Sequence, residues 1–465
     1  PIIDQYLSAL SSSLPDVQLQ IMQSNGGMIN LEEAKQNGVR CILSGPAGGV
    51  VGAKYLFETS RSDDQNAGIG SQDIKLITFD MGGTSTDVSM IDQDLTLTNE
   101  SSIGGCPINI PLLDIHTIGA GGGSIAYIDK GGALCVGPQS AGADPGPACY
   151  GRGDLPTVTD ANLVLGRLVP EFFMGGELHL DPDRSWETVQ RLGDQLGIDV
   201  IQCALGIILV TNAHMERALR IISVERGFDP REFSLFAFGG AGGLHAVELA
   251  RGMSFPRVFI SPYASVLSAY GMLAADIIKD YVQTVMLDDP SSTCQIAAFY
   301  EPLCRQANAD ILSQDIDPNN IIIQRYLDAR YEGQSYELTI PYGLHWESTF
   351  HQSHLRTFGY QSSDSKIQLV NIRVRAIGKT SKPMPHVSLT DSRHTQIPGS
   401  ALIGYREVIC PTHPKSIPFF HHGALTPGSI IKGPAVIVRP DTTVLIGERD
   451  VLQVDDYQNL WINVG

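Results

Sequence analysis

The sequence predicts an α/β fold over residues 1–285, followed by a smaller α+β, β-rich domain over residues 286–465. Three observations predict this division. Up to about residue 285, short apolar runs typical of strands alternate with helical patterns, and glycines gather in the segments between them. The segment "LDDPSSTCQ" then forms a polar break. The chain ends in short strand-like runs separated by turn residues, which predicts a β-meander or a small barrel.

Several helices have recognisable limits in the sequence. Asn30 followed by Glu33 predicts the start of a helix over "LEEAKQ", and Gly38 predicts its end. Apolar residues recur every three or four positions in residues 198–227, which predicts one long helix. After the polar break a helix is predicted over residues 296–313, and strands are predicted in "RYEGQSYELTI" and "KIQLVNIRVRAI".

Length and composition limit the class of protein. A chain of 465 residues is expected to form two to four domains, at roughly 100 to 200 residues each. The net charge of -18 and the pI of about 5.0 argue against a nucleic-acid partner, whose phosphates bind Lys and Arg. The eight cysteines form no CxxC pair, which favours reduced thiols and a cytoplasmic location. Apolar runs stay shorter than the roughly 20 residues of a membrane helix, so no membrane partner is expected.

The first residues, "PIIDQYLSAL", lack an initiator Met and already have helical periodicity. This pattern suggests a fragment or a processed product. A preceding region would then carry any targeting signal and part of a functional site.

The segment "LITFDMGGTSTDVSMID", residues 76–92, predicts a strand, a turn and a returning strand. Gly82 and Gly83 permit positive φ and let backbone N–H groups converge into a concave site for an anion. Thr84, Ser85 and Thr86 add hydroxyl donors. The turn therefore suits the phosphates of a nucleotide such as ATP.

An acid stands at each side of this turn. Asp80 and Asp87 offer the carboxylate oxygens that Mg²⁺ prefers. We therefore assign catalytic roles to Asp80, Thr84 and Asp87. The alternative is an ordinary Gly-Gly hairpin with solvated polar residues. A P-loop is rejected, because the GKT at residues 378–380 has Arg373 where the first glycine should stand.

Three further glycine clusters lie in the α/β part. "LSGPAGGVVGAKYL" passes into a helix whose N-terminus could face phosphate. "HTIGAGGGSIAYID", with Gly121 and Gly122, predicts close approach to a ligand or to another backbone. "LFAFGGAGGLHAVELA", with Gly239, Gly240 and Gly242, is strand, turn and helix, and an adenine or ribose could lie against its bare backbone. Simple tight packing is the alternative for each cluster.

The motifs "QSNGGMINLEEA", "FDMGGTSTDVS", "DIHTIGAGGGSIAYID", "PTVTDANLVLGRL" and "FGGAGGLHA" together resemble the hydantoinase A and 5-oxoprolinase family, to which acetone carboxylase subunits are related. The resemblance implies an actin-like (ribonuclease H-like) ATPase fold that binds ATP and Mg²⁺ and phosphorylates an amide or a carbonyl. It implies that residues 80–87 form a phosphate loop and that residues 238–242 form an adenosine motif. It further implies an additional N-terminal lobe, a hydantoinase B-type subunit or domain, and an oligomer.

Two positions depart from the family pattern. Gly243 stands where "FGGAGP" has proline, which weakens the adenosine assignment. "RPDTTVLIGERD" lacks the usual acidic residue and Pro-Gly turn, and we expect that difference to affect stability only. In "TVTDANLVLG", Asp160 is predicted to be the N-cap of a helix.

A metal site is a further hypothesis. Asp114, His116, Asp144 and Cys149 could bind zinc if folding brought them together. A hydrogen-bonded polar network beneath the glycine loops is the alternative. Cys149 as a nucleophile, paired with His116 or His245, is the weaker possibility, because no activating neighbour can be read from the sequence.

The leading functional hypothesis is ATP-dependent hydrolysis of a cyclic amide such as 5-oxoproline or a hydantoin, through phosphorylation of the amide oxygen. The first alternative is a ketone carboxylase subunit that uses the same phosphorylation. The second is a nucleotide-binding module without turnover of its own. The sequence does not decide between these substrates.

Overall fold

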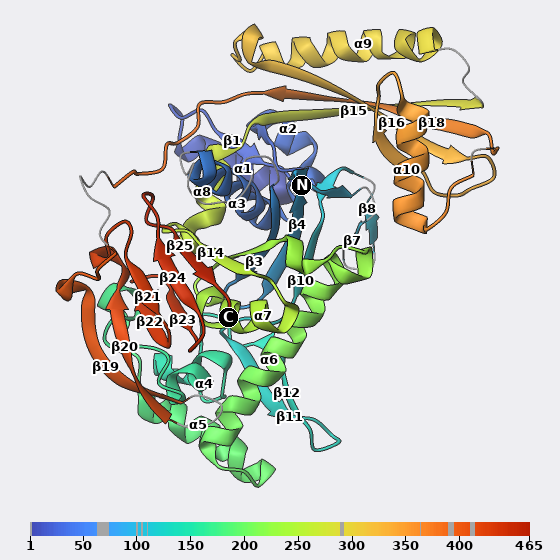
Figure 1. The fold of residues 1–465 in the computed structure, drawn as a ribbon. Helices are drawn as coiled ribbons and strands as arrows, with labels where there is room; N and C mark the ends of the chain where they lie inside the picture. The colour runs from blue at the N-terminus through green and yellow to red at the C-terminus, as the bar shows by residue number, and fades with distance from the viewer. Residues whose placement is uncertain are drawn as a thin grey trace. The chain divides into compact units, whose positions relative to one another are not determined.

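The computed structural model describes residues 2–62, 74–98, 101–103, 106–108, 110–288, 293–362, 364–388, 395–409 and 414–465. They form two compact units that are interleaved along the chain (Figure 1). The first unit comprises Pro1–Gly48, Leu97–Leu113 and Met272–Pro383, and the second comprises Gly49–Thr96, Asp114–Gly271 and Met384–Gly465. The boundary expected at residue 285 falls inside β15 (Ile277–Asp288), a continuous strand of the first unit. The division of the chain into residues 1–285 and 286–465 therefore stays a prediction.

The second unit is built on a nine-stranded sheet. Its order is β10 (Ile115–Ile118), β4 (Thr86–Asp92), β3 (Lys75–Met81), β13 (Ser234–Phe238), β14 (Arg257–Ile260), β25 (Leu460–Asn463), β24 (Val451–Val454) and β21 (Ile430–Lys432), with β5 (Asp94–Leu95) paired to β4. The strands β3, β13 and β14 are parallel neighbours. The predicted hairpin is confirmed: β3 pairs antiparallel with β4, and Asp80 lies opposite Asp87.

Helices cover both faces of this sheet. Phe238 of β13 lies level with Asp80 of the neighbouring strand β3, one residue after Phe79. Because side chains alternate between the two faces of a sheet along a strand, Phe79 and Phe238 point to opposite faces. Phe79 packs beside Gly242 at the start of α7 (Gly242–Met253), and α6 (Val200–Ile222) lies next to α7. Phe238 packs beside Gly49 of α3 (Ser44–Ser62) on the other face.

A four-stranded sheet forms the rest of the C-terminal region. It contains β19 (Leu402–Ile409), β20 (Pro414–His421), β22 (Ala435–Val438) and β23 (Thr443–Ile446). The predicted C-terminal strands are present, but they are shared between two sheets and do not form one barrel. The physical reason is that β25 pairs with β14, where Trp461 packs against Phe259 with ring centroids 4.6 Å apart.

Smaller elements complete the second unit. They are the ribbon β11 (Ser124–Ile128) and β12 (Leu134–Ser140), the helices α4 (Val158–Val164) and α5 (Pro182–Leu196), and the short turns Ala148–Tyr150 and Phe173–Gly176. The long helix predicted over residues 198–227 is confirmed as α6, which Asp199 caps. No single helix among the described residues is long and apolar enough to cross a membrane, although the pair Pro182–Leu196 and Val200–Arg226, bent by 89°, has the length and composition when taken together.

The first unit has its own sheet of six strands. Its order is β1 (Gln20–Met22), β2 (Met28–Asn30), β15, β18 (Ile367–Gly378), β16 (Ile321–Tyr331) and β17 (Leu338–Pro341). Its helices are α1 (Ile2–Ser13), α2 (Leu31–Gln36), α9 (Thr293–Leu312) and α10 (Trp346–Phe358), and two short pairs join β6 (Leu97–Thr98) to β9 (Leu112–Leu113) and β7 (Ser101–Ile103) to β8 (Cys106–Ile108). The predicted cap of α2 is confirmed, because Asn30 accepts a 2.8 Å hydrogen bond from the Glu33 amide.

We predict that Gly243→Ala destabilises the second unit. A Cβ at residue 243 would lie 2.5 Å from the Thr443 carbonyl oxygen and 3.0 Å from Val444 Cγ2, so α7 and β23 would have to separate. Overpacking of this kind costs about 1–3 kcal/mol of unfolding free energy, measurable by urea denaturation. Gly45→Ala is the matched control, since its Cβ meets nothing within 4 Å in a helix. Equal stability of the two variants would contradict the prediction.

Candidate functional site

Three of the predicted glycine clusters converge in the second unit. The Gly122 amide donates to the Gly82 carbonyl at 3.0 Å, and the Gly123 amide donates to the Gly83 carbonyl at 2.7 Å. The Ala241 amide, in the turn after β13, donates to the Met81 carbonyl at 3.0 Å. Backbone hydrogen bonds thus join the β3–β4 turn to both other glycine loops.

The glycines of this junction serve two different purposes. A Cβ on Gly121 would lie 2.7 Å from the Gly83 carbonyl carbon, so the two loops touch only because Gly121 has no side chain. Gly239 has φ +79°, and its Cβ would lie 2.5 Å from Asp80 Oδ1. In contrast, Cβ atoms on Gly82 and Gly83 would meet nothing within 4 Å. The first two glycines permit close packing, whereas the latter two leave open space above the turn.

A cavity of about 220 Å³ opens at this turn. Its polar lining includes Gly82, Gly83, Gly122, Thr159, Asn162, Gly240 and Ala241. Its apolar lining includes Tyr150, Leu168, Val169, Phe172, Phe173, Met174 and Leu244. Phe172 and Met174 are 41% and 54% exposed, so part of this apolar surface is left open. A cavity lined by apolar side chains as well as bare backbone suits a planar base attached to a polar chain.

The structure brings only part of the predicted set to the cavity. Of the predicted residues, Gly82, Gly83, Gly122 and Gly240 line it. The remaining predicted residues, Asp80, Thr84, Ser85, Asp87, Gly121, Gly239 and Gly242, are not among its lining residues. They belong to the same junction, since they lie in the β3–β4 hairpin or beside it.

The two acids of the hairpin form a repulsive pair. Asp80 and Asp87 are cross-strand partners. Burial, together with the charge of Asp87, raises the pKa of Asp80 to about 7. Burial also raises the pKa of Asp87, against a hydrogen bond that the Thr117 hydroxyl of β10 donates to it. Two adjacent, partly buried carboxylates fit a divalent cation, because a cation relieves their repulsion.

A completely buried carboxylate holds one wall of the cavity. The prediction that Asp160 is the N-cap of α4 is wrong. Thr157 is the N-cap, and Asp160 reaches back to it in a capping box. Asp160 accepts further hydrogen bonds from the Cys149 amide at 2.9 Å and from the Ser185 hydroxyl at 2.6 Å. One carboxylate thus joins α4, α5 and the Ala148–Tyr150 turn.

The zinc-site prediction is wrong for the described residues, among which no group of three or more potential ligands is suited to a metal ion. Asp114 forms an ion pair with Arg226, and Asp144 forms one with Arg152. Cys149 is fully buried, and burial together with the nearby Asp160 raises the pKa of its thiol. This thiol is therefore protonated and inaccessible, which also excludes it as a nucleophile.

The glycines of "LSGPAGGVVGAKYL" serve helix packing. They lie inside α3 and not before it. A Cβ on Gly49 would lie 2.7 Å from the Phe238 ring, and one on Gly52 would lie 2.8 Å from the Leu267 carbonyl oxygen of α8 (Leu267–Ala274). The tight-packing alternative therefore holds for these two glycines.

Sequence reasoning missed a C-terminal segment that lines the cavity. Residues 438–443, between β22 and β23, line it, although the departure at "RPDTT" was expected to affect stability only. The Thr442 hydroxyl donates to the Gly240 carbonyl at 3.4 Å. Burial raises the pKa of Asp441, but hydrogen bonds from Ser265 and Arg439 outweigh burial and lower it overall. The sequence feature that could have indicated this part of the cavity is the polar run that directly follows the apolar strand β22.

A series of buried, hydrogen-bonded polar side chains ends at the cavity. His245 lies between two amides, with Nδ1 2.7 Å from Asn212 Oδ1 and Nε2 3.5 Å from Asn162 Nδ2. Arg167 Nη1 donates to Asn162 Oδ1 at 3.3 Å. Burial, with a contribution from Arg167, lowers the pKa of His245 to about 3. The imidazole is therefore neutral at physiological pH.

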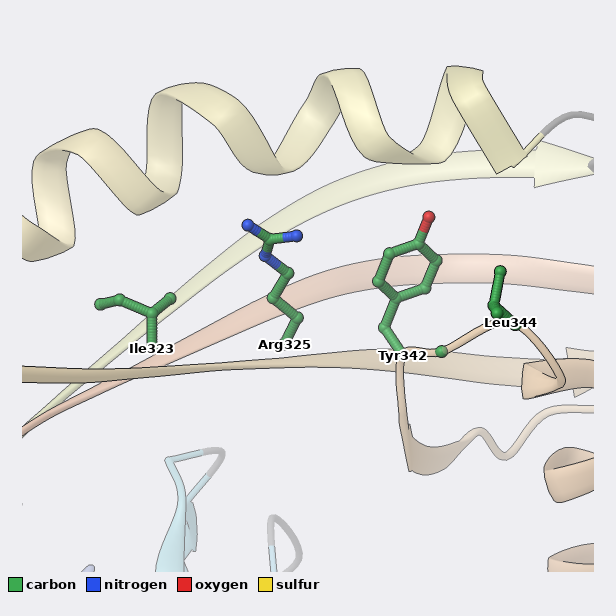
Figure 2. Close-up of a pocket in the computed structure, with 5 residues that line it drawn as sticks. Ile323, Arg325, Tyr342 and Leu344 are labelled. Carbon is green, nitrogen blue, oxygen red and sulfur yellow. The ribbon is translucent and has the colours of Figure 1, made fainter.

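A second cavity, of about 370 Å³, lies in the first unit. Arg325 and Tyr342 point from the sheet toward α9 (Figure 2). There the Arg325 guanidinium lies 5.7 Å from the Tyr300 ring centroid. Its lining contains one glycine, Gly343, and no acid, so it differs from the cavity of the second unit, which several glycines line.

Comparison with known proteins identifies the family. The hydantoinase/oxoprolinase pattern matches residues 1–281, and the pattern of the hydantoinase/oxoprolinase C-terminal domain matches residues 288–463. The chain belongs to the hydantoinase/oxoprolinase family. It is 39% identical over 401 residues to a 5-oxoprolinase of Saccharomyces cerevisiae, covering 82% of this chain and 30% of that protein. It is 32% identical to caprolactamase subunit alpha of Pseudomonas jessenii, covering 96% of this chain and 65% of that subunit.

Two solved structures share the fold. An ATP-dependent caprolactamase from Pseudomonas jessenii superposes with a TM-score of 0.84 at 30% identity, over 100% of this chain and 68% of its own. A nucleotide-free acetone carboxylase superposes with a TM-score of 0.79 at 26% identity, over 99% of this chain and 67% of its own. The predicted family and fold class, an actin-like α/β core with a β-rich C-terminal region, are thereby confirmed. The chain spans less than a third of the yeast relative, so the activity of the whole protein remains a proposal.

We predict opposite effects for two glycines of the junction. Gly121→Ala places a Cβ against the backbone of Gly83 and Thr84, so it should lower the unfolding free energy by about 1–3 kcal/mol. Gly83→Ala adds a methyl group in open space and should leave stability within about 0.5 kcal/mol. It should nevertheless weaken ATP binding by about 10-fold, because it narrows the turn that faces the cavity. Urea denaturation measures the unfolding free energy of both variants, and calorimetry measures their affinity for ATP. Unchanged ATP affinity in Gly83→Ala would remove the turn from the proposed binding site.

We predict acid sensitivity from His245. In the unfolded chain imidazole binds a proton below pH 6.5, whereas the folded state binds it only below about pH 3. Between these values the unfolded state holds more protons, so the free energy of unfolding falls as the pH falls, by at most about 1.4 kcal/mol per pH unit. Burial also lowers the pKa of His422, to about 4, which adds a similar contribution.

The measurement is the slope of unfolding free energy against pH, between pH 4 and pH 6.5. His245→Gln should reduce this slope by about one proton. His214→Gln, at an exposed position of α6, is the control and should leave the slope unchanged. Parallel curves for His245→Gln and the unmodified protein would contradict the prediction.

Proposed function

We propose that this protein takes part in the ATP-dependent opening of a cyclic amide of the 5-oxoproline or hydantoin type. The observation that carries the proposal is the arrangement at the β3–β4 hairpin. There a bare glycine turn faces a cavity, and the paired carboxylates of Asp80 and Asp87 stand at its base. The similarity to a 5-oxoprolinase and to an ATP-dependent caprolactamase supports it.

In this proposal the base of the nucleotide packs against the apolar residues that line the cavity, and its phosphates lie toward Gly82 and Gly83. Asp80 and Asp87 would hold Mg²⁺, which supplies positive charge beside the phosphates when bound. The raised pKa of Asp80 fits this role, since two adjacent carboxylates retain protons until a cation compensates their charge. Thr84, exposed at the turn, would offer a hydroxyl to the phosphate oxygens.

The chemistry addresses the poor reactivity of an amide. The γ-phosphorus–oxygen bond of ATP breaks with its electron pair left on ADP, and a new bond forms between phosphorus and the amide oxygen. Water then adds to the activated carbon. The ring nitrogen takes a proton and leaves with the carbon–nitrogen electron pair, which leaves an acyl phosphate. A second water hydrolyses this to carboxylate and phosphate, so one cyclic amide, one ATP and two waters give one ring-opened carboxylic acid, ADP and phosphate.

A ketone carboxylase subunit is the second candidate, because the fold also superposes on acetone carboxylase. The same transfer would then activate a carbonyl or bicarbonate, and product analysis distinguishes the two. A nucleotide-binding module without turnover is the third candidate, and an ATPase assay tests it. A hydantoinase B-type partner and an oligomer fit the designation of the caprolactamase relative as an alpha subunit. We further propose a cytoplasmic location.

We predict that Asp80→Asn lowers ATP-dependent amide opening by at least about 100-fold, because one of the two proposed cation ligands is lost. Stability should stay equal or rise by about 1 kcal/mol, since the repulsion with Asp87 is removed. The assay measures ADP and ring-opened product from 5-oxoproline, hydantoin and caprolactam, with the chain alone and with a co-expressed hydantoinase B-type subunit.

The matched control is Asp94→Asn in β5, an acid that pairs with Lys54 and is 73% exposed. It should keep full activity. Full activity in Asp80→Asn would remove this residue from the mechanism. Carboxylated product from a ketone, without opening of any cyclic amide, would replace the leading candidate by the second.

A further inference from the structure

The cavity of the first unit is built around one arginine, Arg325 of β16. This cavity of about 370 Å³ is lined by Ile323, Arg325, Tyr342, Gly343 and Leu344. Ile323, Arg325 and Tyr342 leave the sheet on the same side, toward α9 (Figure 2). Cavities of about 300 to 1,000 Å³ are large enough to bind small molecules. The described lining thus combines one cation with apolar side chains in a space that a small molecule could fill.

Arg325 lacks the partners that two arginines of the adjacent strand have. Arg373 of β18 pairs with the buried Asp328 at 2.7 Å. Arg375 of the same strand pairs with Asp280, also at 2.7 Å. Among the residues that the structure describes, no carboxylate pairs with Arg325 and no side chain accepts a hydrogen bond from its guanidinium. Its five N–H groups are therefore left for solvent or for a ligand.

The ring of Tyr300, in α9, holds this guanidinium at the cavity. The ring centroid lies 5.7 Å from Arg325 Cζ, which is within reach of cation–π attraction. Tyr300 is 1% exposed, and its hydroxyl donates to the Tyr326 carbonyl at 2.6 Å, which fixes the ring. The Tyr342 ring lies beside it, with centroids 4.9 Å apart. A guanidinium that packs against a ring keeps its N–H donors available for an anion.

The donors and the apolar lining together define the ligand. A guanidinium binds a carboxylate through two parallel N–H···O bonds, whereas a phosphate dianion calls for more positive charge than one arginine supplies. Ile323 and Leu344 offer apolar surface in the same cavity. We propose that this cavity binds a small carboxylic acid with an aromatic or branched aliphatic body. The residues that carry this inference all belong to the first unit, so it does not depend on the function proposed from the second.

The test is fluorine NMR of para-fluorobenzoate with the purified protein at neutral pH, and para-fluorobenzamide is its uncharged counterpart. We expect a Kd of about 0.1 to 1 mM for the acid. The amide should bind at least about 10-fold more weakly, because it offers no charge to Arg325. Acetate has the charge without the ring, so it should compete at least about 10-fold less well than unlabelled benzoate.

Three variants assign the binding to this cavity. Arg325→Gln should weaken binding of para-fluorobenzoate by at least about 10-fold and keep the fold, since no hydrogen bond of the guanidinium is lost. Leu344→Ser, at a side chain that is 90% exposed, should weaken it by about 3-fold through lost apolar contact. Arg305→Gln is the matched control. It removes the same charge from α9, where Arg305 pairs with Glu301 and is 74% exposed, and should leave the affinity unchanged.

Several results would overturn the proposal. They are equal affinities for the acid and the amide in the unmodified protein, unchanged binding in Arg325→Gln, and no binding of the acid at concentrations up to about 10 mM. Equal losses in Arg305→Gln and Arg325→Gln would also overturn it, because net charge alone would then explain the binding. The comparison of acid with amide in the unmodified protein decides the matter if Arg325→Gln fails to fold.

Discussion

The structure of the second unit depends on direct contact between the backbones of three glycine loops. The β3–β4 turn accepts hydrogen bonds from the Gly122 and Gly123 amides through its Gly82 and Gly83 carbonyls, and the Ala241 amide bonds to Met81 beside it. Backbones approach this closely only where side chains are absent, as at Gly121. The contact holds together the strands that carry the acids, the start of α7 and the glycines that line the cavity.

Charge and polarity are distributed unevenly around this junction. Asp80 and Asp87 face each other and stay unfavourably close, with a raised pKa on each carboxyl. In contrast, the buried Asp160 accepts several hydrogen bonds and holds the wall built from α4 and α5. The hydrogen-bonded carboxylate of Asp160 therefore supports the scaffold, whereas the uncompensated carboxylates of Asp80 and Asp87 are the observation behind the proposed cation site.

The cavity is closed by a segment far along the chain. Residues 438–443 lie about two hundred positions after the Gly240 turn, yet the Thr442 hydroxyl reaches the Gly240 carbonyl. The same C-terminal region supplies β25, which pairs with β14 in the central sheet. The C-terminal β-rich region thus contributes residues to the cavity, and it also forms a sheet of its own. Gly243 permits this, because a larger residue would collide with Thr443.

The sequence by itself determined the local features: the β3–β4 hairpin with its acids, the cap of α2, the long helix α6 and the family, whose motifs are continuous in the chain. These follow from residue period and turn chemistry, which act over a few positions. Only the tertiary structure decided that Asp114 and Asp144 pair with arginines and not with a metal. It alone placed "RPDTT" at the cavity and fixed Asn162 through Arg167 and His245. Such contacts join residues distant in sequence, and no local pattern encodes them.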